Sequence, residues 1–238
     1  MQRLMRLAAA VMVSVLGMAL GLAQTGVKPF KAVTDAMLLK PNPADWLHWR
    51  RTLDAWGYSP LTQINRRNVA QLQLAWSWTM QEGADEATPL VYDGVMYLPS
   101  PNGVQAVDGA TGELIWQHDR SNMARRSLAI HGDKIFAATG EAHLIALDAR
   151  TGTLVWDQTV ADHKLGYKYT SGPIVVNGKV ISGMTGCDYY KEDVCFISAH
   201  DVETGKALWR TSTIARPGER GGDTWGDLPL KFRAGVDS

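Results

Sequence analysis

The chain has 238 residues, 45% of them apolar, and its 24 basic and 24 acidic side chains balance to a formal net charge of zero. This length and apolar fraction suffice for a globular core, and because no basic stripe stands out, the charge pattern argues against a nucleic-acid partner. The 9 tryptophans are many for this length, and three of them belong to a repeat.

The first 23 residues have the pattern of an export signal. Arg3 and Arg6 form a positive segment, and an apolar stretch at 7–22 follows, with small residues toward its end before Ala23. This pattern predicts a signal peptide at 1–23 that is cleaved, so that the mature chain is exported and keeps no membrane span. The alternative is an uncleaved membrane anchor, for which the apolar stretch is short.

Three short pieces are predicted between the signal and the repeats. Residues 24–44 are polar and contain proline, which predicts an extended lead-in. The run 65–72 has the pattern of a short helix, with Asn65 as its N-cap and Val69 and Leu72 on one face. Residues 74–79, Leu-Ala-Trp-Ser-Trp-Thr, alternate and predict a strand.

The chain is organised around a repeat of the form Asp-x-x-Thr-Gly-x-x-x-Trp. Copies begin at Asp108, Asp148 and Asp201, and each follows a short apolar run. The pattern predicts a hairpin in which the Asp side chain caps the turn and the Gly takes a positive φ. The second strand then carries the Trp on a fixed face, where it most simply packs between neighbouring sheets.

A second hairpin signal precedes each copy of the repeat. Asp-Gly at 93–94 and Asn-Gly at 177–178 lie between apolar runs, and the middle unit has His-Gly-Asp at 131–133 instead. Each unit therefore holds about four strands. The units cover approximately residues 74–117, 124–157 and 168–210.

The spacing of the repeat indicates the fold class. The first two copies start 40 residues apart and the third starts 53 residues later, which indicates an insertion. Four strands per unit at this period predict an all-β chain and a partial β-propeller of about three to four blades, with a β-sandwich as the alternative. A propeller closes with roughly four to eight blades. Either the chain oligomerises to close the ring or it is the first part of a longer chain, and the second interpretation is favoured.

Three segments outside the repeat carry a more specific pattern. They are the run from Trp-Gly-Tyr-Ser-Pro-Leu to Leu-Ala-Trp at 56–76, Ala-Thr-Pro-Leu-Val-Tyr-Asp-Gly-Val-Met-Tyr at 87–97 and Gly-Gly-Asp-Thr-Trp-Gly at 221–226. Together with the repeat, they resemble the pyrroloquinoline-quinone (PQQ)-dependent alcohol dehydrogenases. The resemblance runs from about residue 45 to residue 238. It implies the N-terminal part of an eight-bladed propeller with tryptophan-docking repeats.

The resemblance also implies a cofactor site. PQQ would lie across the central channel beside a calcium or lanthanide ion that acts as a Lewis acid, with an Asp as base toward the alcohol. Because the quinone carries three carboxylates, cationic and hydrogen-bonding residues should line its site.

Three residues match the family's contacts to the quinone. Glu86 matches an acidic residue, Arg126 matches an arginine that pairs with a carboxylate, and Thr170 matches a hydroxyl donor. Arg125 is the fallback for the arginine. The alternatives that involve no cofactor are a solvated turn for Glu86, a surface position for Arg126 and a turn cap for Thr170.

The run Gly-Met-Thr-Gly-Cys-Asp at 183–188 matches a further family segment. The match implies that Thr185, Gly186 and Cys187 lie against the quinone. It also places Asp188 where the family has a metal-ligating Glu, and both residue types offer the hard oxygen ligands that calcium prefers.

The assignment of the metal ligand stays open, because Asp188 is one methylene shorter than Glu, and Glu192 and Asp193 are nearby alternatives. Cys187 and Cys195 lie in the same insertion of a chain that is predicted to be exported. We expect them to form a disulfide that closes the loop beside the cofactor. Two free thiols, or a metal held by the two cysteines, are the alternatives.

The family's remaining site residues have no match in this sequence. The tryptophan beneath the quinone, a metal-ligating Asn and the catalytic Asp are expected beyond Ser238, so no catalytic residue is assigned here. No Cys-x-x-Cys-His occurs in the 238 residues, so no haem attachment is predicted within them.

Two functions compete. The first is an exported dehydrogenase fragment that oxidises an alcohol or aldehyde and passes electrons to a periplasmic c-type cytochrome or a quinone. The second is a non-catalytic periplasmic propeller that scaffolds other proteins. The segments 56–76 and 185–188 favour the dehydrogenase, because a scaffold has no need of them. The isolated chain is expected to be inactive.

Overall fold

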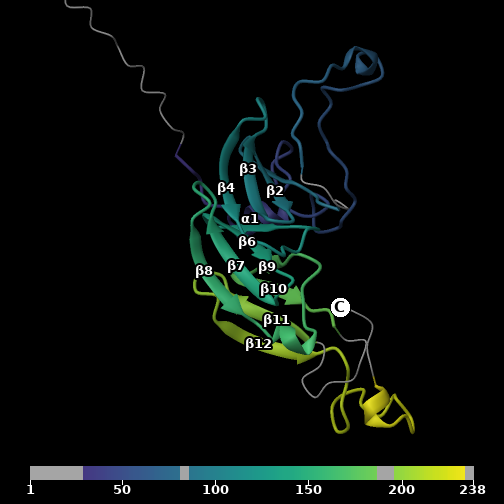
Figure 1. Ribbon diagram of the computed structural model, residues 1–238. Helices are drawn as coiled ribbons and strands as arrows, with labels where there is room; N and C mark the ends of the chain where they lie inside the picture. Colours follow the sequence, from purple (N-terminus) through teal and green to yellow (C-terminus); the bar gives the residue numbers. More distant parts are fainter. Residues whose placement is uncertain (1–28, 81–85, 187–195, 234–238) are drawn as a thin grey trace, which may run out of the picture.

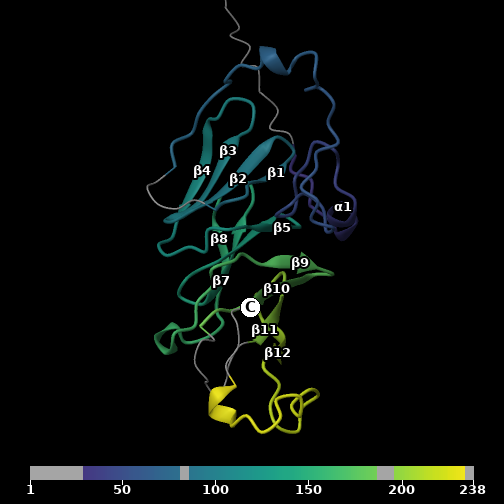
Figure 2. The same cartoon turned by 90° about the vertical axis from the view of Figure 1, so that its right-hand side faces the viewer.

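The computed structural model describes residues 29–80, 86–186 and 196–233. In these residues the chain forms three antiparallel sheets of four strands each, and the strands of each sheet are consecutive in sequence. Figures 1 and 2 show the sheets following one another in chain order along the molecule. The predicted all-β fold class is therefore confirmed. The strands are β1 Leu90–Tyr92, β2 Val95–Ser100, β3 Gly103–Asp108, β4 Leu114–Asp119, β5 Ala129–His131, β6 Lys134–Ala138, β7 His143–Asp148, β8 Leu154–Thr159, β9 Ile174–Val176, β10 Lys179–Gly183, β11 Phe196–Asp201 and β12 Ala207–Ser212.

Both kinds of predicted hairpin turn are present. In the β3–β4 turn, Asp108 Oδ1 accepts hydrogen bonds from the backbone N–H groups of Ala110 and Thr111, each at 2.8 Å. Gly112 closes this turn with a φ of +75°, a conformation that costs glycine little. The β1–β2 turn has positive φ at both Asp93 and Gly94, as a tight two-residue hairpin requires.

Two of the three repeat tryptophans, Trp116 and Trp156, pack against the turn of the following sheet. The Trp116 indole N–H donates to the Ala149 carbonyl at 3.0 Å, and the Trp156 indole N–H donates to the Val202 carbonyl at 3.2 Å. A Cβ added to Gly152 would lie 2.5 Å from the Trp116 ring, so only glycine lets the ring lie flat on this turn. The prediction that the repeat tryptophans pack between sheets is therefore confirmed for Trp116 and Trp156, whereas Trp209 is 41% exposed.

The prediction of a strand at 74–79 is wrong, because this segment is not part of any sheet in the described residues. Trp76 nevertheless lies against Gly112, and its indole N–H donates to the Gly109 carbonyl at 3.1 Å. Trp76 thus makes the same contact to the first sheet that Trp116 makes to the second. A strand needs a hydrogen-bonding neighbour, and alternation alone does not reveal that the described part of the chain offers none to this segment.

The helix predicted at 65–72 is shorter than expected. Only Val69–Gln71 is helical, as a 3₁₀ turn. Asn65 forms a local turn in which its side chain accepts from the backbone N–H of Arg67 at 3.0 Å. Val69 and Leu72 are exposed, so the apolar face that would support a longer helix is not buried.

The lead-in at 24–44 is not extended throughout. Its residues 35–39 form the short helix α1 (Asp35–Leu39), which Thr34 caps through its side chain and which buries Leu38. The lead-in contacts the first two sheets: Val33 pairs with Gly132 in the β5–β6 turn, and the Tyr92 hydroxyl of β1 donates to the Lys31 carbonyl at 2.7 Å. Figure 2 shows α1 on the side of β1, β5 and β9.

Two further 3₁₀ turns occur in the described residues, at His163–Leu165 and Leu230–Phe232. None of the helices in these residues is long and apolar enough to cross a membrane. The predicted signal peptide at 1–23 lies outside the described residues.

Candidate functional site

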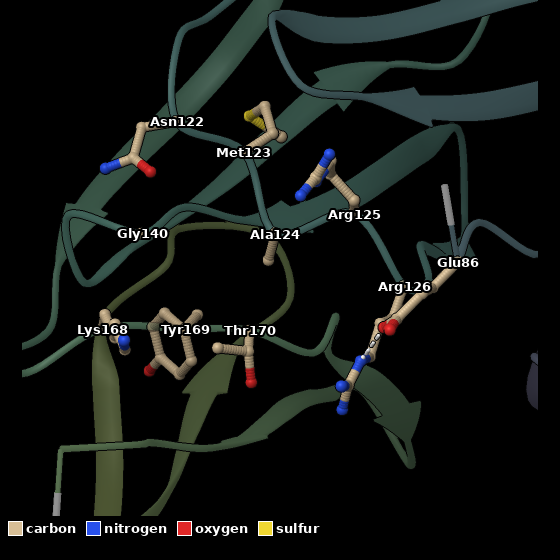
Figure 3. Close-up of a pocket in the computed structure, with 10 residues that line it drawn as sticks. All are labelled: Glu86, Asn122, Met123, Ala124, Arg125, Arg126, Gly140, Lys168, Tyr169 and Thr170. Carbon is tan, nitrogen blue, oxygen red and sulfur yellow. Dashed lines mark hydrogen bonds and ion pairs between the residues drawn. The ribbon is translucent and has the colours of Figure 1, made fainter. Parts of the chain in front are cut away.

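A cavity of about 420 Å³ opens at one end of the sheets. The loops that form it come from all three units: the segment before β1, the β4–β5 and β6–β7 connections, and the β8–β9 connection (Figure 3). The cavity is lined by Glu86, Asn122, Met123, Ala124, Arg125, Arg126, Gly140, Lys168, Tyr169 and Thr170.

Three of the residues predicted to contact PQQ meet in this cavity. Glu86, Arg126 and Thr170 each lie three or four residues before the first strand of a sheet, which is β1, β5 or β9. They therefore occupy similar places in three successive units. Because neighbouring sheets stack in the same orientation, similar places come together at one end of the molecule. The structure brings these three residues together, although the first and the last of them are more than 80 positions apart in the sequence.

Backbone hydrogen bonds hold the lining loops against one another. The Thr88 N–H donates to the Arg126 carbonyl at 3.1 Å, and the Tyr169 N–H donates to the Thr139 carbonyl at 3.3 Å. These bonds join the segment before β1 to the second unit, and the third unit to the β6–β7 connection. The cavity is thus formed by connected loops.

The charged groups in the described lining of the cavity are mostly cationic. Arg126 Nε lies 2.5 Å from Glu86 Oε2, and both side chains are about half exposed, at 52% and 58%. Arg125 and Lys168 add two more positive charges to the lining. Against these three cations, Glu86 is the one carboxylate among the described residues that line this cavity. The donor set therefore suits an anionic ligand, and carboxylates in particular.

Lys168 was missed by the sequence analysis, and Arg125 was considered only as a fallback. A signal for Lys168 was available. Tyr167 and Tyr169 are buried while Lys168 is exposed and Thr170 is partly exposed, so the alternation puts Lys168 on the same side as the predicted Thr170.

Tyr169 forms a wall of the cavity and is almost fully buried. Burial raises the pKa of its hydroxyl above the ordinary value, and the Ser182 hydroxyl donates a hydrogen bond to it at 3.0 Å. Tyr169 is therefore protonated at neutral pH. Its role in the site is to shape the cavity.

Thr185 and Gly186 do not belong to the lining of the cavity. The Thr185 side chain donates to the Lys168 carbonyl at 3.0 Å. A Cβ on Gly186 would lie 2.1 Å from the Gly166 carbonyl oxygen, so this position requires glycine. The two residues thus support the β8–β9 connection, which carries Lys168. Their contact with a cofactor stays a prediction.

The other predicted site residues, Cys187, Asp188 and Cys195, lie outside the described residues, as do the alternative metal ligands Glu192 and Asp193. The expected disulfide and metal ligand therefore stay predictions. Among the residues that the structure does describe, no group of three or more His, Cys, Asp or Glu side chains is close enough to hold a metal ion.

Comparison with known families decides what kind of chain this is. A family profile for PQQ enzymes, described as the glucose/ethanol/alcohol dehydrogenase β-propeller domain, matches residues 46–231. The chain belongs to this family. The PQQ dehydrogenase family thus accounts for the three sheets, which correspond to part of its propeller.

Individual relatives agree with this assignment. Quinohemoprotein alcohol dehydrogenase ADH-IIG of Pseudomonas putida is 39% identical over 191 residues, which is 74% of this chain and 26% of that protein. The structure of ADHIIG from P. putida HK5 superposes with a TM-score of 0.70 and 37% identity, covering 80% of this chain and 31% of that one. A europium-containing methanol dehydrogenase superposes with a TM-score of 0.69 and 32% identity, over 76% and 34% of the two chains. This chain spans 26% to 34% of the length of these relatives.

Proposed function

We propose that this chain is the N-terminal part of an exported PQQ-dependent dehydrogenase and that the cavity forms one side of its cofactor site. The observation that carries the proposal is the meeting of Glu86, Arg126 and Thr170 in one cavity. The resemblance of the sequence to the PQQ enzymes implies, independently of the structure, that these residues contact the quinone. Each comes from a different unit of the repeat.

The side chains of the cavity fit PQQ chemically. Its three carboxylates need positive partners, and Arg125, Arg126 and Lys168 supply them. The Nε of Arg126 contacts Glu86, and the guanidinium carries further N–H donors that can bind a carboxylate in a bidentate manner. The Thr170 hydroxyl can donate to a ligand oxygen. When bound, the quinone supplies the oxidising power for the alcohol reaction.

The further parts of the proposal follow the family. The substrate is a small alcohol or aldehyde, and the electrons pass to a periplasmic c-type cytochrome or a quinone. A calcium or lanthanide ion lies beside PQQ, with Asp188 as its ligand from this chain and Glu192 or Asp193 as alternatives. Residues 1–23 direct the protein to the periplasm.

Titration of the chain with PQQ tests the proposal, with quenching of tryptophan fluorescence as the signal and equilibrium dialysis as a second method. Arg126→Leu removes a charge-assisted hydrogen bond, which contributes about 1.5–3 kcal/mol. We therefore expect its Kd for PQQ to rise by about tenfold or more. The matched control is Arg150→Leu. Arg150 pairs with Asp148 in an exposed turn and does not line the cavity, so its Kd should stay within about twofold of the wild-type value.

Two results would contradict the proposal. One is a wild-type chain that does not bind PQQ, which would favour the non-catalytic scaffold. The other is equal binding by Arg126→Leu and Arg150→Leu, which would move the binding site away from the cavity.

A further inference from the structure

A charged cluster joins the first two sheets beside the cavity, and its centre is Asp157. Arg120 Nη1 donates to Asp157 Oδ2 at 2.9 Å, and His143 Nδ1 lies 2.6 Å from Asp157 Oδ1. The second Nη group of Arg120 is 3.8 Å from Glu141 Oε2. One carboxylate is therefore held from two sides by groups on different elements.

We propose that the Arg120–Asp157 pair is a positioning device for the cavity. It fixes the start of the β4–β5 connection, and this connection carries Arg125 and Arg126 to their places in the lining. That these arginines bind PQQ rests on the proposed function. That the pair holds the β4–β5 connection in place is argued from the contacts in the structure alone.

The place of Arg120 in the chain supports this role. Arg120 directly follows β4, and Asp157 lies within β8, the outer strand of the next sheet. The pair therefore crosses the boundary between two sheets at the end where the cavity opens. Two residues further along, Asn122 begins the part of the connection that lines the cavity.

The connection after Arg120 is tightly fitted. Asn122 has a φ of +57°, which asparagine tolerates better than most residues, and its carbonyl accepts from the Gly140 N–H at 2.6 Å. A Cβ on Gly140 would lie 2.4 Å from the Asn122 side-chain oxygen. The Met123 and Ala124 N–H groups donate to Pro101 and Ala138. Movement at Arg120 would therefore disturb these contacts at the cavity wall.

The pair is also more enclosed than an ordinary surface ion pair. The side chains of Arg120 and Asp157 are each 25% exposed, whereas Arg150 in its pair with Asp148 is 55% exposed. Ion pairs that are partly shielded from water are screened less than exposed ones. In addition, Asp157 and Arg120 each have a second partner, which limits their alternative rotamers.

Hydrogen exchange of the full chain without ligand tests the mechanical part. The reporters are the amides of Met123, Ala124 and Gly140. In Arg120→Gln, we expect them to exchange about fivefold faster than in the wild type, because local opening becomes easier. Amides inside β6 and β7 should keep their wild-type rates. The control variant Arg150→Gln should leave all of these rates unchanged.

Unchanged exchange at the three reporter amides would overturn the proposal. So would equally faster exchange throughout the second sheet, since that pattern means a general loss of stability. Arg120→Lys keeps the charge within reach of Asp157 and should restore most of the protection. If it behaves like Arg120→Gln although the chain is folded, the ion pair does not hold the loop.

PQQ binding tests the functional part. Arg120 does not line the cavity, yet Arg120→Gln should weaken PQQ binding about fivefold, and Arg120→Lys should recover most of it. If the three reporter amides exchange faster in Arg120→Gln but its affinity for PQQ is unchanged, a positioning role is contradicted. If the wild-type chain does not bind PQQ at all, the proposed function fails, while the exchange measurement still decides whether the pair fixes the loop.

Discussion

At the residue scale, the turn carboxylates show how the repeat is held in shape. Hydrogen bonds from Thr111 lower the pKa of Asp108, and hydrogen bonds from Thr204 lower the pKa of Asp201. Each carboxylate binds the N–H groups of its own turn, so its charged form is favoured by the folded hairpin. The Asp of the repeat is therefore a structural residue.

His200 departs from the repeat and is buried in the third sheet. It stands where the other copies have Val107 and Leu147, and it is only 2% exposed. Its ring nitrogens contact the Gly205 carbonyl and the Ser198 hydroxyl at 3.0 and 3.1 Å. Burial lowers the pKa of His200, and the charge of Arg210 adds to this effect.

The first prediction concerns the pH dependence of stability. Below about pH 6.5 an exposed histidine gains a proton, so the unfolded chain binds a proton at this residue while the folded chain does not. The free energy of unfolding that depends on a neutral His200 is therefore fully retained above this pH, and it decreases as the pH drops below it. We expect His200→Leu, which copies Leu147, to lose less stability than the wild type between about pH 7.5 and about pH 5.5 in urea unfolding. His163→Leu, at an exposed position, is the control, and an unchanged pH slope in His200→Leu would refute this account.

At the element scale, the contact between a tryptophan and the next turn is the unit that joins sheets. Trp156 lies on the third sheet's turn, and its ring is 5.8 Å from that of the fully buried Phe136. Trp209 holds the same place in the third copy of the repeat but is 41% exposed, against 9% for Trp156. Trp156 and Trp209 thus occupy equivalent positions of the repeat, but in the described residues only Trp156 packs on a following turn.

The second prediction compares these two versions. Truncating a buried tryptophan to alanine costs about 3–5 kcal/mol, so Trp156→Ala should lower the free energy of unfolding by that amount. The more exposed Trp209→Ala should lower it by no more than about 1 kcal/mol. Urea unfolding followed by circular dichroism measures both values. Equal losses in the two variants would mean that docking on the next turn contributes little to stability.

The elements that were predicted correctly are those that local chemistry determines. Asp-Gly and Asn-Gly turns and the Thr-Gly turn of the repeat specify hairpins within a few residues. The errors fall where distant partners decide the structure. Residues 74–79 alternate like a strand but have no neighbouring strand in the described part of the chain, and α1 depends on burying Leu38 against the sheets.

At the scale of the whole molecule, the site arises from the stacking of similar units. A family resemblance selected Glu86, Arg126 and Thr170, and repetition of the fold brings them into one cavity. The sequence analysis missed Lys168 because no motif marks it, although its alternation with Tyr167 and Tyr169 puts it on the same side as Thr170. The sequence analysis also missed Arg120, because its partner Asp157 is 37 residues away in the sequence and no local pattern links the two.

The most direct test of the central claim is a crystal structure of this chain bound to PQQ. We predict density for the quinone in the cavity, with one carboxylate within hydrogen-bond distance of Arg126 and another ligand oxygen near Thr170. PQQ bound elsewhere on the chain, or bound in the cavity without contact to Arg126, would contradict the assignment of this site.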